Sequence, residues 1–166
     1  SVSTLVPFSH IALTGVNRSE ETVHIIQDSL STDIRKFGRA AGASFGLEGT
    51  VSQALVERRS GFIESDLTPA VWTAKFPNSH PSMAKNPIRS MIGVPLIWGD
   101  EVVACLFVHS IEPNAYSEAE LSVIERVAAQ IAGPVAGSIL RSRDAEVADQ
   151  QETLTRIGSL LGASTD

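Results

Sequence analysis

The chain has 166 residues, of which 43% are hydrophobic and 19% charged, a composition that fits one globular domain with an appendage. Its formal net charge of -6 argues against nucleic acid as a partner, because phosphate binding needs a basic surface. The single cysteine, Cys105, excludes an intrachain disulfide and fits a reducing, cytoplasmic setting. The first residues lack a signal peptide's basic start and apolar core, and no apolar run predicts a membrane span.

Two alternating segments open the chain, His10–Thr14 and Thr22–Gln27, each with apolar residues on one face. The polar, turn-rich Gly15–Glu20 separates them, so we predict a hairpin with a moderately long loop. His10 and His24 fall opposite the apolar residues of their strands. Neither has partner ligands at metal-binding spacing, so we predict surface or half-buried histidines and no metal site.

The next stretch mixes an ambiguous region with a clear helix. Asp28–Gly42 combines polar, charged and small residues and is interpreted as loop with some helix, whereas Ala43–Leu47 could form a short strand. A helix is predicted over Thr50–Arg59, because its first residue and Gln53 form a capping box. Gly61 is expected to end that helix.

A strand over Gly61–Glu64 should then lead into a second short helix. Thr68 and Pro69 are an N-cap and a first-turn proline, and they open a helix that runs through Lys75. The following Phe76–Pro87 has three prolines and no periodicity, which in a compact domain is typical of a lid or binding loop.

The strongest hairpin signal lies further on, where Arg89–Trp98 and Glu101–His109 flank a Gly-Asp turn. Both runs are apolar at nearly every position rather than alternating, which is typical of strands covered on both faces. We therefore predict that they are neighbours in the interior of a sheet. Pro95 cannot donate to a ladder and should lie at a bulge or on an unpaired edge.

The rest of the chain is predicted to be one long helix that starts at a second capping box, Ser117 with Glu120. Its buried face comprises Leu121, Ile124, Val127, Ala128, Ile131 and Val135. Pro134 should kink the helix locally, because it removes a backbone hydrogen bond. The residues around it are small and would let a neighbouring helix approach closely.

Beyond Arg141 the composition becomes polar and helix-favouring, and an apolar residue recurs every seven positions at Leu140, Val147, Leu154 and Leu161. Such a seam predicts pairing with a second helix, although it is thin. A solvated helical tail is the alternative. Because the helix is longer than the domain, we expect it to overhang and pair in a parallel homodimer.

Three segments carry a family resemblance. Ile88–Ile97, Val102–Ser110 and Tyr116–Leu121 resemble the second half of a GAF domain, a small-molecule-binding and dimerising module of signalling proteins. The resemblance is strongest from Gly49 to Leu140. It implies an α+β fold, with a central antiparallel sheet of five to six strands between helices and a long C-terminal signalling helix.

The resemblance also implies a domain plan. Residues 1–140 would form the sensory domain, and residues 141–166 a helical linker toward a covalently attached output domain. Glu152–Asp166 resembles the helix that opens another GAF domain, so the chain is expected to be a piece of a longer protein with tandem modules.

In this family a helix and loop, here Thr68–Pro87, lie over one face of the sheet and cover the ligand pocket. The candidate ligand-binding residues are therefore Asp66, Trp72, His80, Arg89 and His109. Trp72 offers a stacking face and one donor, and Arg89 could bind a carboxylate or phosphate. Each has a plainer interpretation: Trp72 could fill the core, and Arg89 could pair with Asp66 to hold the loop.

The sequence leaves two functions open: a sensor that binds a small molecule and relays the change, or a ligand-free dimerisation and relay module. A polar-lined cavity would favour the sensor, and a space filled by Trp72 and Met91 the relay. Catalysis is not expected, because the chain lacks a Gly-rich phosphate loop, metal-ligand spacing or a nucleophile beside a base. A branch of the family reduces methionine sulfoxide with several cysteines, and Cys105 has no partner.

No cofactor can be named from the sequence. Bilin-binding relatives attach the chromophore through a loop or helix cysteine, whereas Cys105 is predicted mid-strand. The pattern of cyclic-nucleotide-binding relatives is not found. Haem would need an axial histidine facing the pocket, for which His80 and His109 are the candidates.

Overall fold

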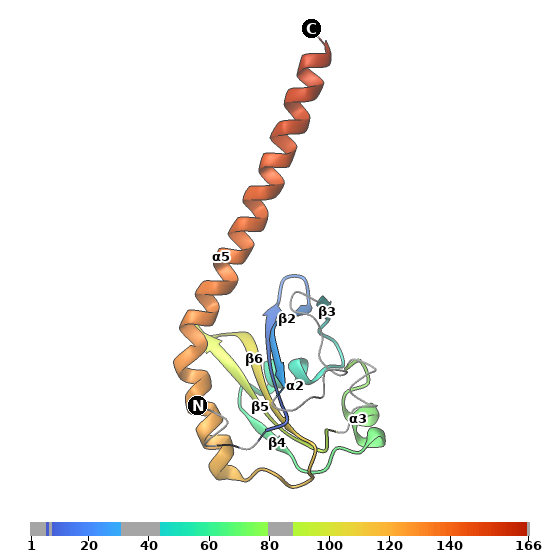
Figure 1. Cartoon of the computed structure of the whole chain (residues 1–166), viewed down its shortest axis with the longest axis vertical. Helices are drawn as coiled ribbons and strands as arrows, with labels where there is room; N and C mark the ends of the chain where they lie inside the picture. The colour runs from blue at the N-terminus through green and yellow to red at the C-terminus, as the bar shows by residue number, and fades with distance from the viewer. Residues whose placement is uncertain (1–5, 7, 31–43, 80–87, 166) are drawn as a thin grey trace. The chain divides into compact units, whose positions relative to one another are not determined.

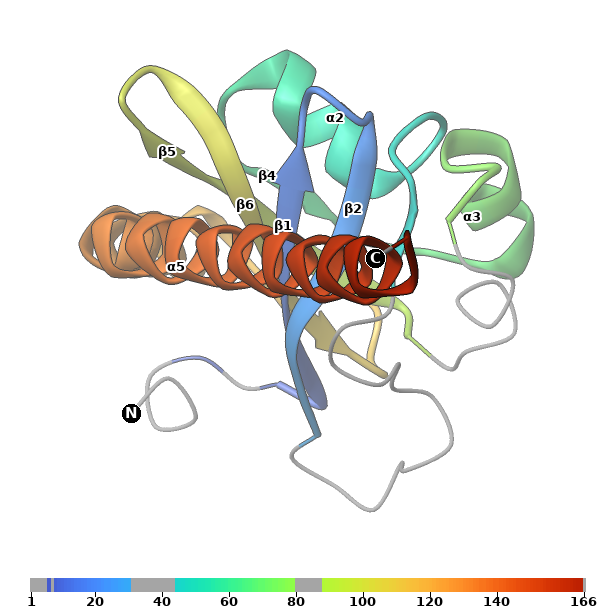
Figure 2. The same cartoon turned by 90° about the horizontal axis from the view of Figure 1, so that it is seen from above.

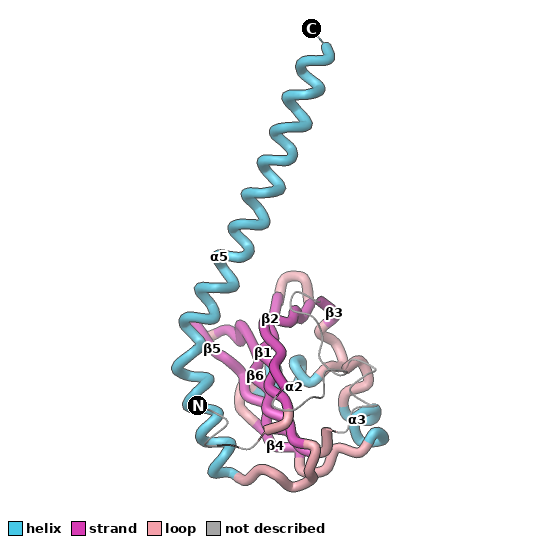
Figure 3. The backbone as a smooth tube through the Cα atoms, viewed as in Figure 1, coloured by secondary structure: helices cyan, strands magenta, loops and turns pink. Residues whose placement is uncertain are grey.

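In the computed structural model, six strands form one antiparallel sheet in the order β3-β2-β1-β6-β5-β4 (Figure 1). The structure describes residues 6, 8–30, 44–79 and 88–165. The predicted α+β class and strand number are confirmed. The strands are β1 (His10–Asn17), β2 (Thr22–Leu30), β3 (Ser44–Gly46), β4 (Phe62–Glu64), β5 (Ser90–Trp98) and β6 (Glu101–Ser110). The helices are α2 (Val51–Arg58), α3 (Pro69–Lys75) and α5 (Glu118–Thr165) (Figure 3).

Strands β5 and β6 pair along almost their whole length and lie between β1 and β4, which confirms the predicted interior hairpin. The ladder between β4 and β5 covers only Met91 to Gly93 on β5. Pro95 pairs with Cys105 of β6 but lies beyond the end of β4, so one edge of β5 has no ladder partner at this position, as a proline requires. A register irregularity follows between Leu96 and Ile97.

The β5–β6 turn is formed by Gly99 and Asp100, as predicted, with positive φ angles of 57° and 67°. Two successive left-handed residues give the turn a twist that matches the flanking strands. The Arg59 guanidinium donates a 2.7 Å hydrogen bond to the Asp100 carbonyl and so ties the turn to the end of α2.

Alternation along the central strands divides the sheet into two covered faces. The first, which we call the inner face, faces α2 and α3; the second, the outer face, faces the first turns of α5 (Figures 1 and 2). The expected arrangement of a sheet between helices is confirmed. Buried inner-face residues that pack with α2 and α3 are Ala12, Val16, Met91, Cys105 and Phe107. Buried outer-face residues are Ile92, Val94, Leu96, Ala104, Leu106 and Val108.

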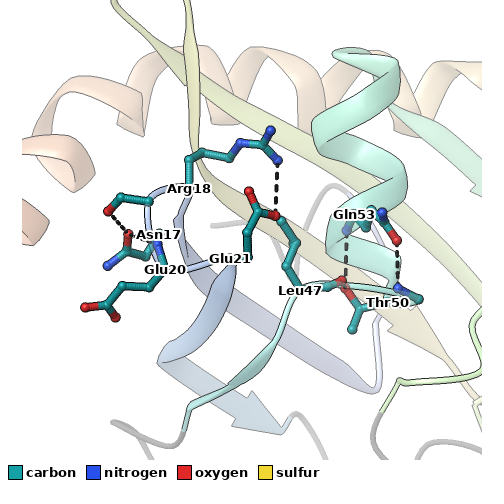
Figure 4. A network of polar contacts seen from close by, with 9 residues as sticks. Asn17, Arg18, Glu20, Glu21, Leu47, Thr50 and Gln53 are labelled. Atoms are coloured by element: carbon teal, nitrogen blue, oxygen red, sulfur yellow. Dashed lines mark hydrogen bonds and ion pairs between the residues drawn. The ribbon is translucent and has the colours of Figure 1, made fainter.

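The β1–β2 hairpin is tighter than predicted. The Asn17 side chain accepts hydrogen bonds from Ser19 Oγ at 2.8 Å and from the Glu20 amide at 3.2 Å (Figure 4). This local turn lets β1 continue to Asn17 and β2 resume at Thr22, so only Arg18–Glu21 remains as loop. The predicted loop therefore started too early, because β1 continues to Asn17, whereas β2 begins at Thr22 as predicted.

Both short helices begin as predicted. Thr50 Oγ1 accepts from the Gln53 amide at 3.2 Å, while the Gln53 side chain accepts from the Gly49 amide at 2.6 Å (Figure 4). Thr68 Oγ1 caps α3 in the same way by accepting from the Val71 amide at 3.3 Å. These caps satisfy backbone donors that have no partner within the helix.

The predicted range of α2 is confirmed to its C-cap Arg59, but the prediction that Gly61 ends the helix was wrong. The helix ends at Arg58, and Arg59 takes the left-handed conformation with φ of 58° while its amide donates to the Leu55 carbonyl. Gly61 has another role: a Cβ on it would stand 2.9 Å from Leu121 of α5 and from Val94 of β5. A larger residue there would force the side chains of Leu121 and Val94 to shift, which favours glycine at this position.

Helix α5 begins as predicted, with the Ser117 amide donating to the Glu120 carboxylate at 2.8 Å, and it continues through Pro134 to Thr165. The chain divides at this point into two compact units, Ser1–Ala132 and Gly133–Asp166. By length and composition alone, Glu118–Arg143 is apolar enough to cross a membrane, contrary to our reading of the sequence. The core helix of a globular domain passes the same test, and three residues of its first turns, Leu121, Ile124 and Ala128, are buried within the first unit.

Candidate functional site

Strand register brings three rows of side chains together on the inner face. His10 lies beside His109, and Met91 follows on β5; Ala12 lies beside Phe107; Thr14 lies beside Cys105. Helix α2 closes over the Thr14 row, since Thr14 Oγ1 is 3.5 Å from Ser52 Oγ. The interior between the sheet and α2 and α3 therefore combines apolar surface with several buried polar groups.

Trp72 is the principal side chain that α3 contributes to this interior. It is 1% exposed, and its ring packs edge-on against Phe76 with 5.8 Å between centroids. Its indole Nε1 is buried, and no residue in the described part of the chain accepts its hydrogen. An unsatisfied buried donor typically costs about 1–3 kcal/mol, so a partner for this N–H would stabilise the fold.

His109 and His10 form a stacked pair at the end of the inner face. Their Nδ1 atoms are 2.8 Å apart, and the rings are 5.0 Å apart and 7° from parallel. The Phe107 ring lies parallel to His109, with 6.1 Å between centroids. Burial, and to a smaller extent the neighbouring His10, hold the pKa of His109 well below its ordinary value.

The pair shows that the predicted exposure of His10 was wrong, and it gives the predicted site residue His109 a partner. His10 is 6% exposed rather than a surface or half-buried residue, because the residues after it on the same face, Ala12 and Thr14, also enter the interior. His109 was a predicted site residue, and its contact with His10 was missed. Nothing in the sequence reports that β1 pairs with β6, so the contact requires the sheet topology.

The predicted residues Asp66 and Arg89 meet each other rather than the interior. Arg89 Nε and Nη2 lie 3.0 Å and 2.5 Å from Asp66 Oδ1, and both side chains are substantially exposed. The Leu67 amide also donates to the Arg89 carbonyl at 2.6 Å. The guanidinium is thus engaged by a carboxylate that holds the loop before α3, which is the plainer of the two interpretations. His80 lies outside the described residues.

Cys105 has the character of a buried structural residue. Burial raises the pKa of its thiol to about 12, although hydrogen bonds with Ser52 and Thr14 oppose the rise. A thiol held in its neutral form is a poor nucleophile and a poor metal ligand. Ser52 and Thr14, which the sequence did not single out, therefore act as polar neighbours of a buried thiol.

The described residues contain no group of three histidine, cysteine or acidic side chains close enough to hold a metal ion. The His10–His109 pair accordingly has no third protein ligand within those ranges. The pair joins two strands through a hydrogen bond between rings, in which one Nδ1 must donate and the other accept.

With this geometry established, comparison identifies the family. A sequence model of the GAF domain matches residues 6–133, and the chain belongs to that family. The match ends beside the boundary between the two compact units and before most of α5. Among curated protein sequences, none matches. The family comprises regulatory and sensory modules, which agrees with the resemblance found in the sequence.

Solved structures show the same fold at low sequence identity. The GAF domain of an Acinetobacter phosphoenolpyruvate-protein phosphotransferase has a TM-score of 0.64 at 16% identity, covering 84% of this chain and 78% of that one. The GAF domain of a sensor histidine kinase from Bacillus halodurans has a TM-score of 0.64 at 15% identity, with coverage of 84% and 90%. A free methionine-R-sulfoxide reductase from Thermoplasma acidophilum has a TM-score of 0.59 at 13% identity, with coverage of 78% and 80%.

Proposed function

We propose that this GAF domain is a non-catalytic regulatory sensor that binds a small molecule between the inner face and α3 with its flanking residues, Leu67–Phe76, which we call the α3 segment. The observation that carries the proposal is the indole N–H of Trp72, which is buried and has no acceptor among the described residues. A ligand that supplies an acceptor there gains a hydrogen bond in a dry environment, where such bonds are strongest.

The surroundings of Trp72 define the chemistry of that ligand. Trp72 and Phe76 offer aromatic rings, and Met91 and Phe107 add apolar surface. These groups suit a compact, largely apolar or aromatic molecule that carries a carbonyl or carboxylate oxygen for the indole. The Arg89 guanidinium is already paired with Asp66, so it supports anion binding only if that ion pair opens.

Two hydrogen bonds support a relay from the ligand region to the long helix. The Asn114 amide, in the loop that leads into α5, donates to the Ser65 carbonyl at 2.7 Å. Ser65 lies in the connection that leads to α3. In the same loop, the Glu112 carbonyl accepts from Ser90 Oγ at 2.6 Å. A displacement of the α3 segment is therefore coupled by direct hydrogen bonds to the chain that starts α5.

We further propose that α5 pairs in a parallel homodimer and carries the change to a covalently linked output domain in the cytoplasm. Its 48 residues correspond to ~72 Å of helix. Leu140, the first residue of the predicted seam, is 57% exposed, and Ile157, which lies between its last two positions, is 47% exposed. Light scattering should give the mass of a dimer for the full chain and a smaller assembly for a truncation that ends at Leu140. A monomeric full chain at tens of micromolar would remove the basis of this relay.

A ligand-free relay module is the second candidate, and one observation favours it. Trp72 and Met91 are both almost completely buried and belong to one continuous core cluster. On this account the two side chains fill the space that a ligand would occupy in other members of the family. The fold would then only dimerise and transmit movements from a preceding module.

Replacing Trp72 by Phe separates the two functions, with Trp98→Phe as the matched control because Trp98 is 56% exposed at the β5–β6 turn. An absorption spectrum of the purified protein and a thermal-shift screen of small carboxylates and aromatic metabolites would first identify a ligand. Calorimetry should then show about tenfold weaker binding to Trp72→Phe, because one hydrogen bond to the ligand is lost. Binding to Trp98→Phe should be unchanged. If no compound binds and Trp72→Phe is as stable as the parent or more so, the ligand-free relay is the better account.

A further inference from the structure

The stacked imidazoles of His10 and His109 lie at a junction of the fold. His10 starts β1, where the chain enters the sheet, and His109 lies near the end of β6, where the chain leaves toward α5. Two further hydrogen bonds join the same segments: the Ser9 amide donates to the His109 carbonyl at 2.8 Å, and the Ile111 amide donates to Ser9 Oγ at 3.3 Å.

The distance between the rings restricts how many protons the pair can hold. At 2.8 Å, one Nδ1 must carry a hydrogen and the other must accept it with its lone pair. A first additional proton can enter at Nε2 of the donating ring, which leaves the bond between the Nδ1 atoms in place and makes it charge-assisted. A second proton must enter at Nδ1 of the accepting ring, where two N–H groups and two positive charges would then face each other.

We propose that the His10–His109 pair is a proton-operated latch that joins the entry of the domain to its exit toward α5, closed at neutral pH and opened by acid. Opening separates the first residues of β1 from the end of β6 and exposes both rings to water. Each ring can then take its own proton. The latch does not depend on the proposed ligand, so it survives if the sensor proposal fails.

Two carboxylates on the described neighbouring elements are already engaged by cations. On β4, Glu64 lies across Met91 from His109, and its two oxygens bind the Lys75 ammonium of α3 at 2.8 and 2.9 Å. At the strand ends Asp66 is paired with Arg89.

The direction of the pH effect follows from proton linkage. The folded pKa of His109 lies below the value of about 6.5 for a free histidine, so the open state binds more protons below that pH. Stability of the closed latch is therefore fully present above pH 6.5 and is lost as the pH falls. For one additional proton the closing equilibrium weakens about tenfold per pH unit below 6.5.

Hydrogen exchange measured residue by residue by NMR tests the latch, with rates normalised to the intrinsic rate at each pH. The reporters are the amides of Ser9 and Ile111, and the amide of Leu106, in the middle of β6, is the internal reference. Between pH 7.5 and 5.5 the reporter protection should fall about tenfold while the reference changes little. Equal protection of the reporters at both pH values would overturn the proposal.

His109→Asn, whose amide can still bond to His10, should remove this pH dependence, and His24→Asn, on the neighbouring strand, should retain it. Retention of the pH dependence in His109→Asn would assign the effect to another group. If that variant does not fold, ¹⁵N spectra of the histidine rings in the unaltered protein test the latch through the position of the ring hydrogens. The latch requires one ring with hydrogen on Nδ1 and the other with hydrogen on Nε2 at pH 7.5. Two rings that both carry hydrogen only on Nε2 would refute it.

Discussion

The two faces of the sheet are built from different chemistry. The outer face presents Ile92, Val94, Leu96, Leu106 and Val108, all apolar, to the first turns of α5. The inner face buries two histidines, a threonine, a cysteine and an indole N–H without an acceptor among the described residues. Buried polar groups cost free energy unless they are paired. The inner face is therefore expected to contribute less to the stability of the fold than the apolar outer face. This difference supports the inner face as the functional one.

The largest predicted effect is on the outer face. Ile92 is fully buried in the central hairpin, and Ile92→Ala should lower the free energy of unfolding by about 2–5 kcal/mol, because it leaves a cavity that packed neighbours cannot fill. Urea denaturation followed by tryptophan fluorescence measures the change. Ligand affinity in the folded variant should be unaffected. A loss below about 1 kcal/mol would contradict the view that the outer face contributes most of the stability.

A smaller effect is expected at the centre of the inner face. Cys105→Ser should change the free energy of unfolding by less than about 1.5 kcal/mol, because Ser52 and Thr14 already offer hydrogen-bond partners to the buried side chain. Thermal denaturation of the variant and parent, with the ligand titration repeated, tests this. Loss of a measurable catalytic turnover in Cys105→Ser would instead reveal an active site at this position.

The smallest effect is predicted outside both faces. Asp66→Ala breaks an exposed ion pair with Arg89, and exposed pairs contribute only about 0–1 kcal/mol. Affinity for an uncharged ligand should not change. For a ligand with a carboxylate or phosphate, the freed guanidinium should raise affinity. A strong loss of affinity with either kind of ligand would place Asp66 in the site.

Local signals in the sequence predicted most of the elements, because caps and apolar runs act within a few residues. Thr50, Thr68 and Ser117 each begin a helix where expected, and the Gly99-Asp100 turn joins two interior strands. The errors came from interactions that local patterns do not encode. The end of α2 at Arg59 depends on a single left-handed residue, and the length of β1 depends on the Asn17 side chain.

The candidate site was predicted less completely than the fold. Of the predicted site residues, Trp72 and His109 are buried in the interior, whereas Arg89 and Asp66 pair at the surface. The His10–His109 contact joins residues 99 positions apart, and only the order of strands in the sheet brings them together. Ser52 contacts Cys105 because α2 packs across β1 and β6, a crossing that no spacing in the sequence reports.

The central claim, that a ligand on the inner face is coupled to α5, is tested most directly by hydrogen exchange with and without the ligand identified by screening. The account predicts increased protection of the amides in α3 and, through the Asn114–Ser65 hydrogen bond, of the loop that starts α5. The amides of Ile92 and Val94, whose side chains lie on the outer face of β5, should change little. Protection confined to residues 133–165, with α3 unchanged, would place the ligand elsewhere and contradict the claim.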